Sequence, residues 1–182
     1  MKIALTVGHS LLKNGSYTSA DGVKYGGVNE YKWCKAWSKQ IKKALEKDGH
    51  KVDRIVCPEK KFAHSTEEKN YKLGIINSGN YDLVIELHLN AASSEAHGTE
   101  VLYKSNDGKK YASAIQKQLS TVFSDRGIKN RNDLYILNGT KPTAILIETF
   151  FCTSKDDYKK AKGLVKRTKL AELVRKGLSN VK

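Results

Sequence analysis

The sequence predicts a single α/β domain built around a mixed, mostly parallel sheet of about six strands. Short apolar runs rich in β-forming residues alternate with longer segments whose apolar residues recur every three or four positions. A length of 182 residues suits one domain whose hydrophobic core is large enough to be stable without disulfides or structural metal ions. The composition, 39% apolar and 29% charged residues, is typical of globular proteins.

The first half of the chain predicts three strands and two helices. Each strand is a short apolar run, and the third is almost continuously apolar, which indicates a central position in the sheet. A glycine-rich loop, residues 15–27, separates the first strand from the first helix. The predicted strands are residues 2–7, 51–56 and 82–87, and the predicted helices are residues 28–47 and 65–77.

The second half predicts three further strands that lie close together along the chain. Their crowding favours some antiparallel pairing, so the sheet is expected to be mixed. A helix precedes the second of these strands, and the tail of the chain is helical, in one or two pieces. The predicted strands are residues 99–103, 134–137 and 143–147, and the predicted helical segments are residues 111–123 and 154–179.

The net charge of +14 is the strongest compositional signal. Such a charge attracts polyanions, which include nucleic acids, anionic lipids and anionic cell-wall polymers. All but five of the 33 basic residues are lysines, which act as solvated point charges, so no specific reading of nucleic-acid bases is expected. A lysine-rich surface that is simply solvated remains the alternative.

The cysteines and the apolar runs exclude two further classes of protein. Cys34, Cys57 and Cys152 are odd in number and lack Cys-x-x-Cys spacing, which argues against a disulfide framework and predicts buried, reduced thiols. No apolar run is long enough to span a membrane. The N-terminus does not have the pattern of a signal peptide, so the chain is expected to be made in the cytoplasm.

Three polar side chains follow predicted strands. His9 follows the first strand, His88 the third and Glu148 the last. Because sites in open α/β sheets form at the carboxyl ends of strands, these side chains are expected to meet at one edge. Glu30 lies in the first turn of the first helix, three and four residues before Trp33 and Cys34, and therefore points toward the buried face.

Two histidines and one carboxylate form a ligand set that suits catalytic zinc. Such a site uses three protein ligands, here His9, Glu30 and His88, and leaves a fourth position for water. A further carboxylate is then needed as general base, and Glu148 is placed for that role. Asn90 could orient a ligand or contact the substrate. Taken singly, each residue could instead be an ordinary strand-end or helix-start side chain, and Glu86 is expected to be a buried, paired acid.

These residues resemble the amidase-3 family, the zinc-dependent N-acetylmuramoyl-L-alanine amidases. The resemblance spans nearly the whole chain and is nearest to catalytic domains of phage endolysins and autolysins of Gram-positive bacteria. It rests on four motifs in order: Val7-Gly8-His9, a glutamate at the start of the next helix, Leu87-His88-Leu89-Asn90-Ala91 and Ile147-Glu148-Thr149-Phe150-Phe151.

The resemblance implies hydrolysis of the amide between N-acetylmuramic acid and the L-alanine of the stem peptide in peptidoglycan. It also implies a sheet with helices on both faces, one Zn²⁺ held by His9, Glu30 and His88, and Glu148 as catalytic acid and base. Asn90 and Thr149 are candidate substrate or supporting contacts. Residues 1–182 would form the catalytic domain, with no wall-binding domain visible, and would act on the cell wall after release from the cytoplasm.

The same residues and composition are compatible with two other functions. The same ligand set would serve a zinc peptidase that cleaves stem peptides. A basic module that binds polyanions without catalysis would explain the charge alone.

Overall fold

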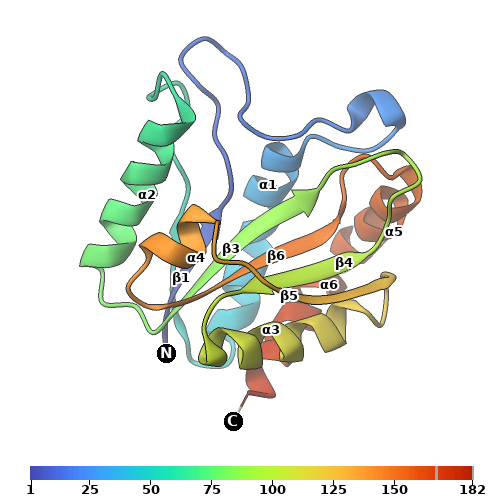
Figure 1. Cartoon of the computed structure of the whole chain (residues 1–182). Helices are drawn as coiled ribbons and strands as arrows, with labels where there is room; N and C mark the ends of the chain where they lie inside the picture. Colours follow the sequence, from blue (N-terminus) through green and yellow to red (C-terminus); the bar gives the residue numbers. More distant parts are fainter. Residues whose placement is uncertain (167, 182) are drawn as a thin grey trace.

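The computed structural model describes residues 1–166 and 168–181, and within them six strands form one sheet in the order β2-β1-β3-β6-β4-β5. Helices cover both faces of the sheet (Figure 1). The strands are β1 Lys2–Val7, β2 Lys51–Ile55, β3 Leu83–Asn90, β4 Thr99–Tyr103, β5 Asp125–Asn130 and β6 Thr143–Phe151. The helices are α1 Glu30–Glu46, α2 Ser65–Ser78, α3 Asn106–Leu119, α4 Tyr135–Gly139, α5 Lys155–Lys166 and α6 Lys169–Ser179.

The pairing of the strands confirms a mixed, mostly parallel sheet. β2, β1, β3 and β6 pair in parallel, β4 pairs antiparallel to β6, and β5 pairs in parallel with β4. β3 lies between β1 and β6, as its continuous apolar sequence predicts. β3 and β6 are longer than predicted, so His88 and Glu148 lie within these strands rather than after them.

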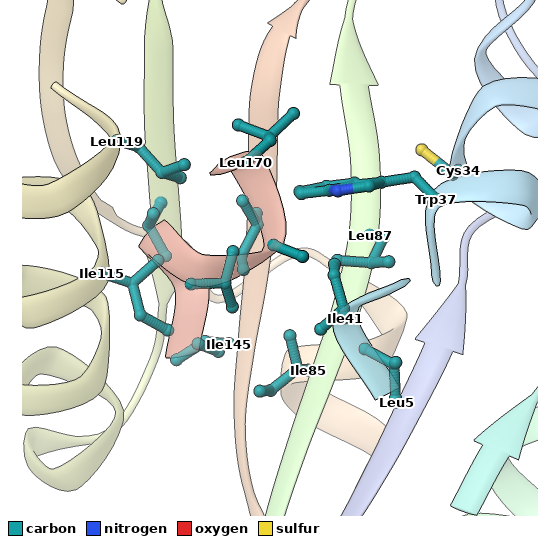
Figure 2. Packing of buried hydrophobic residues seen from close by; sticks show 14 of the residues in the cluster. Leu5, Cys34, Trp37, Ile41, Ile85, Leu87, Ile115, Leu119, Ile145 and Leu170 are labelled. Atoms are coloured by element: carbon teal, nitrogen blue, oxygen red, sulfur yellow. The ribbon is translucent and has the colours of Figure 1, made fainter. Parts of the chain in front are cut away.

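The larger part of the core lies between the sheet and α1, α3, α5 and α6. Figure 2 shows Trp37 and Ile41 of α1 packed over the sheet, with Ile115 and Leu119 of α3 on the other side of Leu170. Fully burying one such side chain stabilises the fold by about 1.5–3 kcal/mol. This layer therefore holds the start of α1 rigidly over the carboxyl ends of the strands.

A smaller cluster on the opposite face packs α2 and α4 against the sheet. It joins Ile76 of α2 and Ile136 and Leu137 of α4 to alternate side chains of the strands, among them Val84 and Leu146. Because side chains alternate along a strand, Glu86 and His88 share this face with Val84. Figure 1 shows α2 and α4 over this face of the sheet, on the side to which Glu86 and His88 point.

Two predicted elements of the second half were wrong in kind or extent, and one strand was not predicted. The segment 134–137 is not a strand but the start of α4, because a short apolar run does not distinguish a strand from a helical turn. β5 was not predicted, since it is a polar edge strand that pairs with β4. The helix expected at 111–123 begins earlier, where Ser105 caps α3 by accepting a hydrogen bond from the Gly108 amide at 3.0 Å, and ends at Leu119.

Other predictions are confirmed. The helical tail forms α5 and α6, and Arg167 between them lies outside the described residues, as does Lys182 at the end of the predicted domain. Cys34, Cys57 and Cys152 are buried and free of disulfides. Among the described helices, none is long and apolar enough to cross a membrane.

Candidate metal centre and active site

Four of the predicted site residues gather at the carboxyl ends of the central strands. His9 lies two residues beyond the end of β1, and its backbone adopts a left-handed conformation with φ of 65°. His88 lies in β3 and Glu148 in β6, and their Cα atoms are register partners in adjacent strands. Glu30 is the first residue of α1.

Glu30 is held in place by backbone donors from two segments. The side chain of Asn29 caps α1 by accepting a hydrogen bond from the Lys32 amide at 3.1 Å, which fixes the first turn. The Glu30 carboxylate is only 3% exposed and accepts hydrogen bonds from the amides of Leu89 and Ala20, each at 3.1 Å. Its burial and its place at a helix N-terminus, where an anion is favoured, agree with the prediction.

Both histidines approach this carboxylate. Glu30 Oε2 lies 3.2 Å from His9 Nε2, and Glu30 Oε1 lies 2.8 Å from His88 Nδ1. The two imidazole rings meet edge to face with centroids 4.8 Å apart. Within the described part of the chain, these three residues form the one group of histidine, cysteine and acidic side chains that could hold a metal ion. Two neutral imidazoles and a carboxylate suit zinc, so the donors present fit the expected metal.

Gly8 allows the His88 ring to lie where it does. A Cβ atom at Gly8 would lie 2.2 Å from both Cε1 and Nε2 of His88. Its backbone is not in the left-handed region, so the requirement for glycine here comes from the close approach of the ring. The Gly8 amide also donates to the Leu87 carbonyl at 3.0 Å, which ties the end of β1 to β3.

The charges of the site shift the pKa values of its members. Burial alone would raise the pKa of Glu30, but hydrogen bonds to His88 and His9 and the charges of both rings lower it well below its ordinary value. Burial would lower the pKa of His88, but hydrogen bonds to Glu30 and Glu86 outweigh it and raise the pKa to about 10. The site therefore strongly favours a positive charge between these carboxylates, which a divalent cation also supplies.

Glu148 differs from the other acids of the site because its carboxylate lacks a cationic or hydrogen-bonding partner at one oxygen. Oε2 is shielded from solvent and accepts no hydrogen bond from the described residues. Burial raises the pKa of Glu148 to about 8. The charge of His88 lowers this pKa, whereas the charges of Glu30 and Glu100 raise it further. A carboxyl group that exchanges its proton near neutral pH is suited to general acid–base catalysis.

The two candidate contact residues differ in their surroundings. Asn90 is partly exposed at the end of β3, and its Nδ2 donates to Glu100 Oε1 at 2.7 Å. Thr149 is fully buried, and its Oγ1 has no hydrogen-bond partner among the described residues. The roles of Asn90 and Thr149 as substrate or supporting contacts therefore stay predictions.

Lys72 and Tyr135 are site neighbours that the sequence analysis missed. They contact Glu86, which is fully buried and paired, as expected. A weak signal for Lys72 exists, because it lies at helical spacing between Glu68 and Ile76, the other buried residues of α2. Tyr135 carries no such signal, since its segment was predicted as a strand.

Known proteins match both the sequence and the fold. The family model described as N-acetylmuramoyl-L-alanine amidase matches residues 3–180. Among solved structures, the catalytic domain of CD27L, an endolysin targeting Clostridia Difficile, is 53% identical, with a TM-score of 0.94. That match covers 99% of this chain and 97% of the endolysin chain.

Curated relatives match part of the chain. An uncharacterized cell wall amidase of Bacillus anthracis is 31% identical over 127 residues, which are 63% of this chain and 24% of the relative. The N-acetylmuramoyl-L-alanine amidase LytC of Bacillus subtilis (strain 168) is 32% identical over 107 residues, 55% of this chain and 21% of LytC. The match thus spans about a quarter of the length of these two relatives.

The matches confirm the resemblance drawn from the four motifs. The family model covers almost the whole chain, and the endolysin catalytic domain is more than half identical to it over nearly its full length. The chain therefore belongs to the N-acetylmuramoyl-L-alanine amidase family, amidase-3.

Proposed function

We propose that this chain is a zinc-dependent peptidoglycan amidase that hydrolyses the bond between N-acetylmuramic acid and the L-alanine of the stem peptide. The observation that carries the proposal is the assembly of His9, Glu30 and His88 around one point, with Glu148 on the adjacent strand, whose Oε2 has no hydrogen-bond partner among the described residues. Family membership supports the reaction, and the donor set supports zinc as the metal.

His9, Glu30 and His88 would hold the metal. When bound, zinc polarises a carbonyl group and lowers the pKa of water to about 7. Two backbone amides already orient the Glu30 carboxylate toward both histidines. The buried layer under α1 keeps that carboxylate at the strand ends.

Glu148 would move the proton during hydrolysis. One of its carboxylate oxygens accepts a proton from the attacking water as the new C–O bond forms at the lactyl carbonyl carbon. The same oxygen then donates that proton to the alanine nitrogen as the C–N bond breaks, so atoms and charge balance. The pKa of about 8 lets one carboxyl group perform both transfers near neutral pH. Asn90, partly exposed beside Glu148, is a candidate contact for the substrate.

The test is digestion of purified peptidoglycan with zinc-loaded protein. An amidase releases new N-terminal alanine while the number of reducing sugar ends stays constant. Glu148→Gln is expected to lower the rate by about 10²–10⁴-fold. The variant should keep its zinc content and should melt no lower than the unmodified chain, because Gln has nearly the same shape as Glu and does not titrate.

The other functions predict different products. A peptidase acting within the stem peptide exposes N-termini other than this alanine. A binding module yields no product, and its binding to the wall survives both chelation and Glu148→Gln. Either result would overturn the proposal.

The proposed reaction makes peptidoglycan the substrate and the cell wall the place of action. We propose that the chain acts on the cell wall and that its charge of +14 draws it to anionic wall polymers.

A further inference from the structure

We propose that Glu86, held by Lys72 and Tyr135, is a positioning residue that keeps the proton of His88 on Nε2 and so directs Nδ1 to the metal. The inference deepens the proposed function, since it rests on His88 as a metal ligand. It assigns a role to a buried network on the α2 and α4 face that the reaction itself does not use (Figure 1).

Glu86 is surrounded by hydrogen-bond donors. Its carboxylate is fully buried in β3. Oε2 accepts from Thr6 Oγ1 at 2.9 Å, from Lys72 Nζ at 3.2 Å and from Tyr135 Oη at 2.7 Å. Oε1 accepts from Tyr135 Oη at 3.0 Å and lies 3.1 Å from His88 Nε2. A carboxylate with a cation and two hydroxyl donors is stabilised as the anion.

The ionised state of Glu86 determines which ring nitrogen of His88 carries the proton. An ionised carboxylate only accepts hydrogen bonds, so the Nε2 that faces it must be the donor. In the neutral ring that metals bind, the lone pair is then on Nδ1. Nδ1 is the nitrogen that lies 2.8 Å from Glu30 Oε1, on the side of the ligand group.

Gly8 gives independent support for this orientation. It lies so close to Cε1 and Nε2 of His88 that no room exists for even a Cβ atom there. The Nε2 edge of the ring is therefore closed by Gly8 and Glu86. A metal ion can reach the ring at Nδ1.

Lys72 is difficult to explain by stability alone. It is 1% exposed, its Nζ donates to the Val7 carbonyl at 3.1 Å, and it lies 5.2 Å from the centre of the Tyr135 ring. Replacing a buried ion pair by apolar residues of similar volume is often neutral or stabilising. The pair Lys72 and Glu86 thus points to a role beyond folding. Carboxylates that hold metal-bound histidines in this way contribute about 10–100-fold to metal affinity.

Two double variants separate this role from a structural one. Lys72→Met with Glu86→Leu removes both charges and the acceptor for Nε2. Lys72→Met with Glu86→Gln removes the same charges but keeps an oxygen that accepts from Nε2. Lys47→Met with Glu172→Leu is a surface control, because it removes an ion pair of 2.7 Å between Lys47, the C-cap of α1, and Glu172 of α6, away from the site.

The main readout is the zinc dissociation constant, measured by competition with a chelator of known affinity. The Leu double variant should bind zinc about 10–100-fold more weakly than the unmodified chain. The Gln double variant should recover most of that loss, and the control should bind like the unmodified chain. Equal affinity of the Leu and Gln double variants, whether both weak or both unchanged, would overturn the proposal.

A second readout needs no variant. In ¹H–¹⁵N spectra of the zinc-loaded chain, the ring of His88 should carry its proton on Nε2 and bind zinc through Nδ1. Zinc bound through Nε2 would overturn the proposal even if the double variants fail to fold.

Neither readout uses peptidoglycan. A chain that binds zinc as expected but does not digest the wall would refute the proposed function and leave this inference standing. An active amidase with zinc on Nε2 would do the reverse.

Discussion

Replacing Gly8 by alanine is the sharpest single test of the site geometry. The added Cβ would lie 2.2 Å from two atoms of the His88 ring, whereas ordinary contacts begin at 3.4 Å. The ring would have to retreat by about 1.2 Å, which is the difference between these distances. The backbone at Gly8 needs no left-handed conformation, so the clash with the ring is the whole perturbation.

The size of the effect follows from the precision that the site needs. A misplacement of about 1 Å in a catalytic group can cost about 10²-fold in rate. Gly8→Ala should therefore lower kcat/KM on peptidoglycan about 100-fold and weaken zinc binding about 10-fold or more. The fold should survive, because overpacking one such position costs about 1–3 kcal/mol.

The assay compares Gly8→Ala with Gly74→Ala. Gly74 lies in α2, and a Cβ there would meet nothing within 4 Å. Gly74→Ala should raise the free energy of unfolding by roughly 1 kcal/mol through helix propensity and leave zinc affinity unchanged. Both proteins are examined by chelator competition, thermal unfolding and release of N-terminal alanine. Zinc affinity in Gly8→Ala within about twofold of the unmodified chain would refute the reasoning.

Three further predictions follow from the charges and the ligand set. Zinc at about 100 times its dissociation constant should stabilise the fold by about 2.7 kcal/mol, which raises the Tm by roughly 5–10 °C. A chelator should reverse this rise, and His88→Ala should abolish it. A Tm that does not change when zinc is added would contradict the proposed metal site. Because the pKa of Glu148 is raised to about 8 in the folded chain, its contribution to stability is full below about pH 4.5 and is lost as pH rises through 8. Urea unfolding in the presence of a chelator should thus show that Glu148→Gln gains stability relative to the unmodified chain from pH 5 to pH 9. If the difference in the free energy of unfolding between the two proteins does not change with pH, the pKa of Glu148 is not raised. The rate of hydrolysis of whole cell walls should fall as the salt concentration rises, because salt screens the attraction to the wall, whereas the rate on a small uncharged muramoyl peptide should stay constant. The same salt dependence for both substrates would show that charge does not steer the enzyme to the wall.

Much of the architecture could be predicted because local patterns carried it. β1 and β3 are buried strands, so their sequences are nearly continuous apolar runs bounded by turn residues. α1 shows its buried stripe in the spacing of Trp37, Ile41 and Ala44. The rule that parallel strands end at one edge then places His9, His88 and Glu148 together without any knowledge of contacts.

The elements that escaped prediction lack such patterns. β5 forms the edge of the sheet, so it buries few side chains and shows no alternation. α4 is a five-residue helix whose two buried apolar residues also fit a short strand. Both errors fall where the local sequence contains too little periodic signal.

The sequence by itself indicated which candidate donors lie at the carboxyl ends of the strands, because the ends of strands and the spacing within helices are local properties of the chain. Only the tertiary structure decided which nitrogen of His88 faces Glu30, why Gly8 must lack a side chain and what neutralises Glu86. The last of these answers depends on Lys72 and Tyr135, which lie 14 and 49 residues from Glu86 and reach it from helices packed on the sheet. Contacts of that kind arise from packing in three dimensions, and no short-range pattern encodes them.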